Sequence, residues 1–341
     1  MKALVCSSLG LFDNLSLRNV PDPVPDDDEV LIDIVVAALN FPEVLIIAGT
    51  YQIKPALPFI VGGEAAGVVC EVGRKVTSIK LGDRVALTGS VGAFAEKVIK
   101  KDHELVRIPD NMTFNVAAGF CVAYGTSYFA LKQCGNVRTG DTVLVLGAAG
   151  GVGLAAVDIA HALGARVIAA ASSDTKIEIA KSVGAHDGIR YDRDSLKERT
   201  KLLTNGKGAD VVLDPVGGEA SEQALRAIAW NGRFLVVGFA AGAIPHIPLN
   251  LALLKNCSIC GVSFGAWAQR YPEICNRNFN ELFDLYTDGL LQPLVSESFG
   301  LEDFRSAFAS LTERRATGKV ILRIRNESQE PWNNKASRKV G

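Results

Sequence analysis

The 341-residue sequence has almost no net charge and no run of basic side chains. Its 36 lysines and arginines are balanced by 37 acidic residues, which leaves a formal net charge of −1. This balance provides no general attraction for nucleic acid or an anionic membrane surface. No apolar run reaches the roughly 20 residues of a transmembrane helix, and no signal peptide is evident after the strand-like start at Met1. We therefore expect a globular protein whose partner is a small molecule, not a membrane or nucleic acid.

The sequence is also poor in groups that could hold a metal. Its seven cysteines are an odd number and mostly lie in apolar runs, which is typical of a reduced intracellular compartment. We expect the cytoplasm, with mitochondria as the alternative. Cys257 and Cys260 form a C-x-x-C pair, but no second pair accompanies it, and an extended strand would turn the two side chains to opposite faces. The four histidines are scattered and do not supply the three protein ligands of a catalytic zinc, so the sequence predicts no metal site.

What the chain does contain is enough apolar residues for two domains. Hydrophobic residues make up 48% of the sequence and charged residues 21%. Residues 1–121 are predicted to form short strands separated by turns, among them 30–36, 64–72, 82–85 and 95–99. From 122 to 262, apolar strands alternate with helices, which predicts a parallel sheet covered on both faces. The expected strands are 142–146, 166–171, 186–190, 210–213, 233–238 and 257–263, and the expected helices are 151–163, 174–183, 194–204, 219–229 and 249–255.

The remainder of the chain returns to mixed structure. We expect helices at 272–288 and 301–314 and a closing strand at 319–324. Residues 326–341 are polar with a single tryptophan, which predicts a disordered tail.

The stretch from Val143 to Gly153 carries the clearest functional signal. A short apolar run breaks into glycines and then enters a helix-like segment, 154–163. Glycines let the backbone approach a pyrophosphate closely, and a helix N-terminus offers free N–H groups and a partial positive charge. Because the turn opens the alternating region, it predicts a dinucleotide site at Ala149, Gly150, Gly151, Val152 and Gly153. A purely structural strand-to-helix turn is the alternative.

The end of the next strand indicates which dinucleotide binds. NAD-binding proteins place an acidic residue there, which holds the ribose 2′-hydroxyl. Here the position is Ala171, and the hydroxyl and ammonium groups of Ser172, Ser173 and Lys176 follow, which suit a 2′-phosphate. Asp174 would oppose a phosphate, but we expect it to be the N-cap of the following helix. The sequence therefore predicts NADPH.

Several further motifs occur in a fixed order along residues 1–325. They are Leu39-Asn-Phe41 leading to Gly49-Thr-Tyr51, Pro58-Phe-Ile-Val-Gly-Gly-Glu-Ala-Ala-Gly67, Gly82-Asp-Arg-Val85, Ala123-Tyr-Gly-Thr-Ser-Tyr128, the glycine turn, Asp214-Pro-Val-Gly-Gly218 and Gly265-Ala-Trp-Ala-Gln-Arg270. Together they resemble the medium-chain dehydrogenase/reductase superfamily, and in particular its zinc-free quinone oxidoreductase (zeta-crystallin-like) branch. The last motif looks most like the quinone oxidoreductase-like protein 2 type within that branch.

The resemblance implies an α/β fold in two domains and a homodimer. Residues 1–121 and 263–325 would form a GroES-like β-barrel domain, and residues 122–262 a Rossmann domain with a doubly wound parallel sheet. It also implies that Asn40, Tyr51 and Thr126 lie near the nicotinamide, where Tyr51 would donate a proton, bind an oxyanion or only shape the pocket. The alternative for Asn40 is that it only holds a backbone turn. The predicted set of cofactor contacts is completed by Tyr191, Gly238, Phe239 and Phe264; Phe264 could also form an apolar substrate wall or pack in the core.

The chain departs from the zinc enzymes of the same superfamily at the metal-ligand positions. Those enzymes place a Cys near position 41 and a His before the Glu of the Gly-His-Glu segment, where this chain has Phe41 and Gly63. Their four-cysteine structural lobe is also absent, because Val91-Gly-Ala-Phe94 passes straight through.

Without a metal, the acceptor of the hydride must already be electrophilic. We therefore expect NADPH-dependent reduction of quinones or related conjugated carbonyls. Reduction of an enoyl thioester or an enal is the alternative activity. A non-catalytic NADPH-binding scaffold or RNA-binding protein is the alternative outside enzymology, and the balanced charge argues against it.

Overall fold

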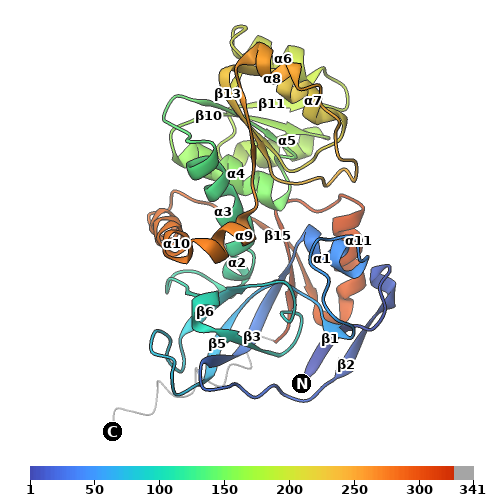
Figure 1. Ribbon diagram of the computed structural model, residues 1–341, viewed down its shortest axis with the longest axis vertical. Helices are drawn as coiled ribbons and strands as arrows, with labels where there is room; N and C mark the ends of the chain where they lie inside the picture. The colour runs from blue at the N-terminus through green and yellow to red at the C-terminus, as the bar shows by residue number, and fades with distance from the viewer. Residues whose placement is uncertain (326–341) are drawn as a thin grey trace. The chain divides into compact units, whose positions relative to one another are not determined.

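The computed structural model describes residues 1–325, and the predicted disordered tail lies outside them. The chain divides into two compact units. Within the described residues, unit 1 comprises 1–121 and 295–325, and unit 2 comprises 122–294 (Figure 1). Both ends of the described chain therefore belong to the same unit.

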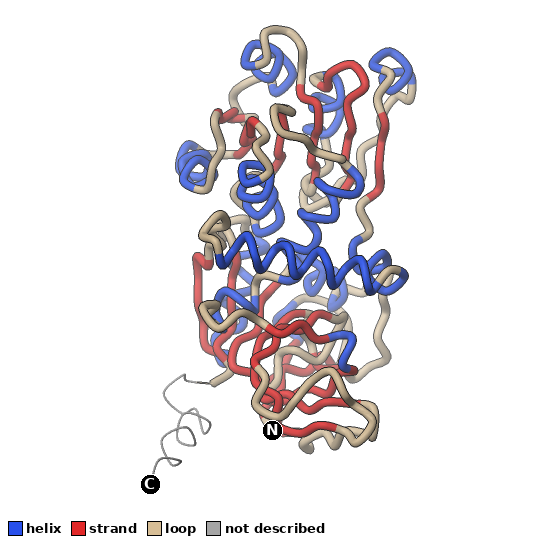
Figure 2. Tube along the Cα trace, turned by 90° about the vertical axis from the view of Figure 1, so that its left-hand side faces the viewer, coloured by secondary structure: helices blue, strands red, loops and turns tan. Residues whose placement is uncertain are grey.

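Unit 1 is built mainly from strands (Figure 2). Its strand pairings are antiparallel except that between β15 and β16. The long strand β3 (Glu29–Leu39) is buried from Val30 onward and pairs with β5, β7 and β16. Its larger sheet runs β15-β16-β3-β5-β6-β8, and a smaller sheet runs β2-β1-β4. The other strands are β1 (Lys2–Cys6), β2 (Leu15–Asn19), β4 (Phe59–Ile60), β5 (Glu64–Val72), β6 (Arg84–Thr88), β7 (Lys97–Lys101), β8 (Leu105–Arg107), β15 (Val295–Gly300) and β16 (Lys319–Arg323).

Short helices complete unit 1. Its core includes Phe94, Phe304 and Phe308, so α11, near the end of the described chain, packs on strands from its beginning. The predicted helix at 301–314 is divided into the 3₁₀ helix η4 (Leu301–Asp303) and α11 (Phe304–Thr312). The others are η1 (Phe12–Asn14), α1 (Phe41–Ile47), η2 (Asp102–Glu104) and α2 (Phe114–Ala118).

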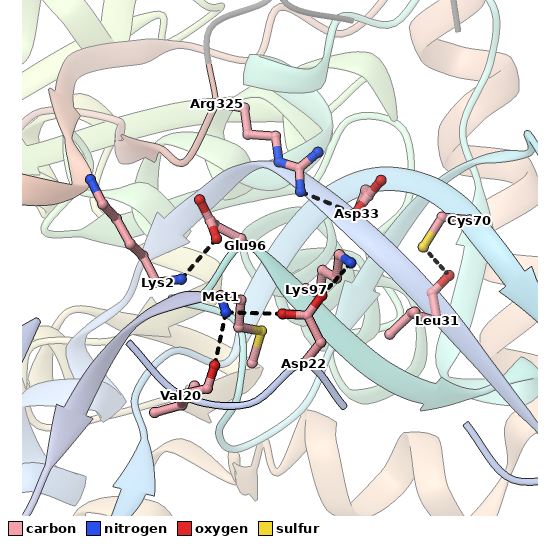
Figure 3. Close-up of polar contacts among 10 residues, drawn as sticks. All are labelled: Met1, Lys2, Val20, Asp22, Leu31, Asp33, Cys70, Glu96, Lys97 and Arg325. Atoms are coloured by element: carbon pink, nitrogen blue, oxygen red, sulfur yellow. Dashed lines mark hydrogen bonds and ion pairs between the residues drawn. The ribbon is translucent and has the colours of Figure 1, made fainter. Parts of the chain in front are cut away.

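A polar cluster holds distant segments of unit 1 together (Figure 3). The amino group of Met1 donates to the carbonyl of Val20 and to Asp22, which also pairs with Lys97. Arg325 donates to Asp33 on β3 at 3.1 Å. These contacts anchor both ends of the described chain on the long strand and its neighbours.

Unit 2 contains a six-stranded sheet in which every pairing is parallel. The strand order is β11-β10-β9-β12-β13-β14, so the order reverses between β9 and β12. In open α/β sheets, ligands bind beyond the carboxyl ends of the strands at such a reversal. The strands are β9 (Thr142–Leu146), β10 (Arg166–Ala171), β11 (Asp187–Arg190), β12 (Ala209–Asp214), β13 (Ile228–Val236) and β14 (Ser258–Gly261).

Helices cover both faces of this sheet (Figures 1 and 2). Connecting helices α4 and α5 pack on β9, β10 and β11, whereas α7 and α8 pack on β12 and β13. The predicted parallel sheet with two covered faces is therefore confirmed. The helices are α4 (Gly151–Ala162), α5 (Asp174–Ser182), α6 (Leu196–Leu203), α7 (Glu219–Arg226) and α8 (Asn250–Lys255).

The segment 263–294 groups with unit 2, whereas its predicted place was in the first domain. It contains the unforeseen helix α9 (Phe264–Arg270) and helix α10 (Pro272–Thr287). Trp267 stacks on Phe129 with ring centroids 4.4 Å apart, and Phe264 meets Phe279 edge-on. Phe129 belongs to the π-helix η3 (Phe129–Cys134) that follows α3 (Cys121–Tyr128), so aromatic packing holds the segment in unit 2.

A buried carboxylate also lies inside unit 2. Asp158 of α4 is 2% exposed and accepts hydrogen bonds from the Tyr124 hydroxyl at 2.6 Å and the Gln292 N–H at 2.8 Å. Burial raises the pKa of this carboxyl to about 6. Within residues 1–325, no helix is long and apolar enough to cross a membrane.

Candidate functional site

The glycine turn joins β9 to α4 in unit 2. Gly147 has a φ of +58°, and a Cβ on Gly153 would lie 2.2 Å from the Gly147 carbonyl oxygen. Only glycine at 153 therefore lets the helix start this close to the strand. Gly150 is the N-cap of α4, and no side chain caps the first turn or places a negative charge there. The N–H groups of that turn are thus available to an anion, and the turn fits a dinucleotide pyrophosphate.

Helix α3, which carries Thr126, contacts this turn through the next residue, Ser127. Ser127 of α3 is fully buried, and its hydroxyl donates to the Val152 carbonyl at 2.9 Å. Thr126 itself is half-buried. The contact to the turn is thus made by Ser127, and the catalytic role of Thr126 stays a prediction.

The predicted 2′-phosphate site lies where β10 ends. The prediction that Asp174 caps α5 is wrong, because Ser173 is the N-cap and its hydroxyl accepts the Lys176 N–H at 3.2 Å. A serine hydroxyl can serve the N-cap equally well, and it stands one position earlier. Asp174 is instead in the first turn, with its carboxylate toward two arginines.

Those arginines were missed by the sequence analysis. Arg190 pairs with Asp174 at 2.8 Å and Arg193 pairs with it at 3.0 Å. The hydrogen bond from Arg190 is the main cause that lowers the pKa of the Asp174 carboxyl. Arg190 also pairs with Asp192 at 2.6 Å. The two arginines thus balance the two aspartates, so Asp174 does not argue against a phosphate beside Ser172. Arg190 could have been found from the predicted strand ends, because Arg190 and Ala171 are the last residues of β11 and β10. In the parallel sheet these two residues lie opposite each other.

The remaining predicted cofactor contacts lie on unit 2 as well. Tyr191, just after β11, packs against the apolar core of the sheet. Gly238 follows β13 and donates its N–H to the Asp214 carbonyl at 3.3 Å, and Phe239 is partly exposed beside Gly217. Strand ends of a parallel sheet share one edge, so these residues and the glycine turn lie along the same edge.

Phe264 has a strong packing role. A Cβ on Gly125 would lie 2.6 Å from the ring of Phe264, so the ring rests directly on the α3 backbone next to Thr126. The ring remains half-buried. Of the three roles predicted for Phe264, the described contacts document packing.

In unit 1, Asn40 belongs to a buried polar network between β3, α1, β5 and β16. The Asn40 amide donates to Glu64 at 3.1 Å, and the Lys319 ammonium donates to the Asn40 oxygen at 2.5 Å and to Glu64 at 3.0 Å. Glu64 is fully buried and Lys319 is 7% exposed. Glu43 accepts the Asn40 backbone N–H at 2.9 Å. The network therefore fixes both the backbone and the side chain of Asn40.

Two groups near this network have shifted pKa values. Burial raises the pKa of Glu43 to about 7, although Lys319 and the hydrogen bonds to its carboxylate oppose the shift. Tyr51 is half-buried and packs against the core of unit 1. Burial, with a smaller contribution from Glu43, raises the pKa of the Tyr51 hydroxyl above its usual value of 10. Tyr51 therefore keeps its proton at neutral pH and can donate a hydrogen bond.

The position of the missing zinc ligand is closed by packing. A Cβ on Gly63 would lie 2.7 Å from the Gly89 carbonyl oxygen and 3.1 Å from a Glu43 carboxylate oxygen. The Gly63 N–H donates to that same oxygen at 2.9 Å. Among residues 1–325, no three His, Cys, Asp or Glu side chains are grouped as a metal would require. The residues present do not fit the catalytic zinc of the superfamily's alcohol dehydrogenases.

Comparisons with known proteins match both parts of the chain. Residues 26–110 match the "Alcohol dehydrogenase GroES-like domain" and residues 151–280 match the "Zinc-binding dehydrogenase" domain. These matches confirm the predicted fold class, a GroES-like domain combined with a Rossmann-type parallel sheet. The second domain is named for zinc, although the ligand positions differ here.

The chain is also similar over almost its whole length to individual proteins. It is 39% identical over 328 residues to a quinone oxidoreductase-like protein 2 homolog of Nematostella vectensis. The aligned residues make up 94% of this chain and 88% of the relative. It is 40% identical over 306 residues to quinone oxidoreductase-like protein 2 of Bos taurus, covering 89% and 87%. The solved structure of Escherichia coli quinone oxidoreductase complexed with NADPH is similar with a TM-score of 0.89 and 29% identity, covering 95% and 100%.

Proposed function

The chain belongs to the quinone oxidoreductase family of medium-chain dehydrogenases/reductases, and from that premise we propose that it transfers hydride from NADPH to quinones or related conjugated carbonyls. The single observation that best supports NADPH binding is the N-terminus of α4, which no side chain caps. The close contact between Gly153 and Gly147 brings this helix start against the end of β9. The absence of an acid at Ala171 and the balanced charge of Asp174 favour NADPH over NADH.

NADPH would supply the hydride, and the protein's own residues would orient the acceptor and stabilise charge on it. The acceptor must be electrophilic without help, because the residues present do not form a zinc site. We propose that Asn40 and Tyr51 of unit 1 provide polar contacts to the acceptor, and that Thr126 of unit 2 provides a polar contact to the nicotinamide. The raised pKa of Tyr51 makes it a hydrogen-bond donor to an oxygen and a poor source of a free proton at neutral pH, so water would complete the protonation.

Stopped-flow oxidation of NADPH by purified protein tests this function. A naphthoquinone, an enal and an enoyl thioester would be compared, with NADH as the matched cofactor control. We expect the quinone to be reduced fastest and NADPH to be preferred. Fast enoyl reduction without quinone turnover would assign the protein to the alternative activity. Tight NADPH binding without turnover of any acceptor would favour a non-catalytic role.

We further propose a homodimer formed through the edge of the unit 2 sheet. Strand β14 ends the described sheet, so one side of its backbone has no neighbouring strand there. Apolar side chains lie exposed on this strand and on nearby segments of unit 2: Ile259 is 41%, Trp230 is 66% and Leu253 is 80% exposed. Identical edge strands can pair about a two-fold axis, which would cover both edges at once. Light scattering should give the mass of a dimer for the wild type and of a monomer for Ile259→Lys; a monomeric wild type would refute the proposal.

A further inference from the structure

The side-chain amide of Asn40 has a fixed orientation. Its oxygen faces the Lys319 ammonium at 2.5 Å, and its nitrogen faces the Glu64 carboxylate at 3.1 Å. A rotation by 180° would place the amide NH₂ against an ammonium and the amide oxygen against a carboxylate. Both new contacts would be repulsive, so the ion pair prevents the amide from flipping.

The cation that holds the amide oxygen is itself fully engaged. The three N–H groups of Lys319 have three acceptors: Asn40, Glu64 and the Leu39 carbonyl at 3.4 Å. Lys319 and Glu64 are buried, whereas Asn40 is only half-buried. Gly119 makes room for the lysine, because a Cβ there would lie 3.0 Å from Lys319 Cγ. Lys319 is therefore built to hold Asn40 and has no donor left for a ligand.

One N–H of the Asn40 side chain makes no hydrogen bond among those described. The amide nitrogen has two hydrogens, and Glu64 is the acceptor found for one of them in the described residues. The second hydrogen is a donor on the less buried member of the network. The ammonium at the oxygen withdraws electrons from the amide and strengthens this donor.

We propose that Lys319 and Glu64 are positioning residues that fix Asn40 as a hydrogen-bond donor to the acceptor oxygen on which charge develops. The inference rests on the proposed function. Hydride transfer would break a C–H bond of NADPH, which is oxidised to NADP, and form a C–H bond in the conjugated carbonyl, whose oxygen receives an electron pair. A proton from water, which leaves hydroxide, would then complete the reduced product. A donor aimed at the carbonyl oxygen stabilises the transition state more than the neutral ground state.

A double-mutant cycle between Asn40→Ala and Lys319→Met tests the proposal. We expect Asn40→Ala to lower kcat with a naphthoquinone at least tenfold and to leave the Kd for NADPH within twofold. Lys319→Met should lower kcat to a similar extent in the wild type and cause no further loss in the Asn40→Ala background. Lys319→Arg, which keeps a cationic donor, should retain more activity than Lys319→Met.

Two further variants control for stability. Lys319→Met leaves Glu64 buried without its cation and could prevent folding. Lys319→Met combined with Glu64→Gln removes both charges; the side-chain amide introduced at position 64 can pair with either end of Asn40, so the flip is no longer opposed and kcat should still fall. Arg325→Met breaks the Asp33 ion pair in the same unit, roughly 20 Å away along β3, and should leave kcat unchanged.

The outcomes separate the two proposals. Full activity of Asn40→Ala, or a further loss when Lys319→Met is added to it, would overturn the positioning role in an active enzyme. Full activity of a folded protein that combines Lys319→Met with Glu64→Gln would also overturn the positioning role. Absence of wild-type turnover with every acceptor would instead refute the proposed function itself.

Discussion

Replacing Gly150 and Gly153 by alanine should separate cofactor binding from stability, although both glycines lie in one turn. At Gly153 the new Cβ would lie 2.2 Å from the Gly147 carbonyl oxygen, about 1 Å closer than a normal contact allows. At Gly150 it would lie 3.4 Å from the same oxygen, which is ordinary contact. Gly150 also has a φ of −78°, which alanine adopts without strain.

The two changes therefore have different expected magnitudes. Gly153→Ala must push the helix start away from the strand, at a cost of about 1–3 kcal/mol that the better helix propensity of alanine only partly offsets. Gly150→Ala should change the free energy of unfolding by less than about 1 kcal/mol, since alanine also restricts the unfolded chain. Its methyl group would instead keep a pyrophosphate from the backbone, and we expect the Kd for NADPH to rise at least tenfold, or about 1.4 kcal/mol.

The assay is thermal unfolding in parallel with NADPH fluorescence titration. Gly153→Ala should lower Tm by several degrees in the absence of cofactor, whereas Gly150→Ala should keep Tm and lose affinity. Gly140→Ala cannot serve as the matched glycine control for Tm, because Gly140 has a φ of +87°, at which alanine is strained. A Gly150→Ala protein with wild-type affinity would show that the turn does not approach the pyrophosphate. A Gly153→Ala protein with unchanged Tm would refute the packing argument.

Three further variants test other parts of unit 2. Lys176→Ala should weaken NADPH about tenfold or more and NADH little, and equal losses in titrations would place Lys176 away from the 2′-phosphate. Asp174→Asn removes a negative charge beside the predicted phosphate and releases Arg193, whereas Asp192 still holds Arg190 at 2.6 Å. NADPH should therefore bind several-fold more tightly, and weaker binding would show that Asp174 positions the arginines productively. Asp158→Asn keeps an oxygen for both hydrogen bonds but cannot titrate. The pKa of about 6 exceeds the ~3.9 of an unfolded Asp, so the native state holds the extra proton and wild-type stability should fall by about 2 kcal/mol as pH rises from 4 to 7. Urea unfolding should show a smaller fall for Asp158→Asn, with a remainder from Glu43, and identical pH dependence would contradict the shift.

The sheet of unit 2 was predictable because local signals agree with its tertiary environment. Strands β9 and β10 match the expected ranges residue for residue, since each is a continuous apolar run that a glycine or serine turn ends. Strand β13 begins five residues before the predicted range. Its exposed segment Trp230-Asn231 includes a left-handed residue at Asn231, with a φ of +61°, and therefore resembles a turn in the sequence.

Contacts between distant residues could not be predicted in the same way. The boundary after residue 262 looked natural because the alternating pattern ends there, yet Trp267 and Phe264 attach the next segment to unit 2 by aromatic packing. Arg193 lies 19 residues from Asp174, and Lys319 lies 279 residues from Asn40. Neither pair has a helical or hairpin spacing, so only the folded register brings the partners together.

At the position of the zinc ligands, the sequence shows which ligands are missing, and the structure shows which contacts take their place. Phe41 and Gly63 reveal that two ligands are missing, and this suffices to predict that no zinc binds. They do not reveal what replaces the metal. The Gly63 N–H and the Asn40 N–H converge on Glu43, and a side chain at position 63 would collide with Gly89. Restoring a histidine at 63 would therefore break this carboxylate network before it could supply a ligand, so the metal-free site is maintained by packing as well as by the missing ligands.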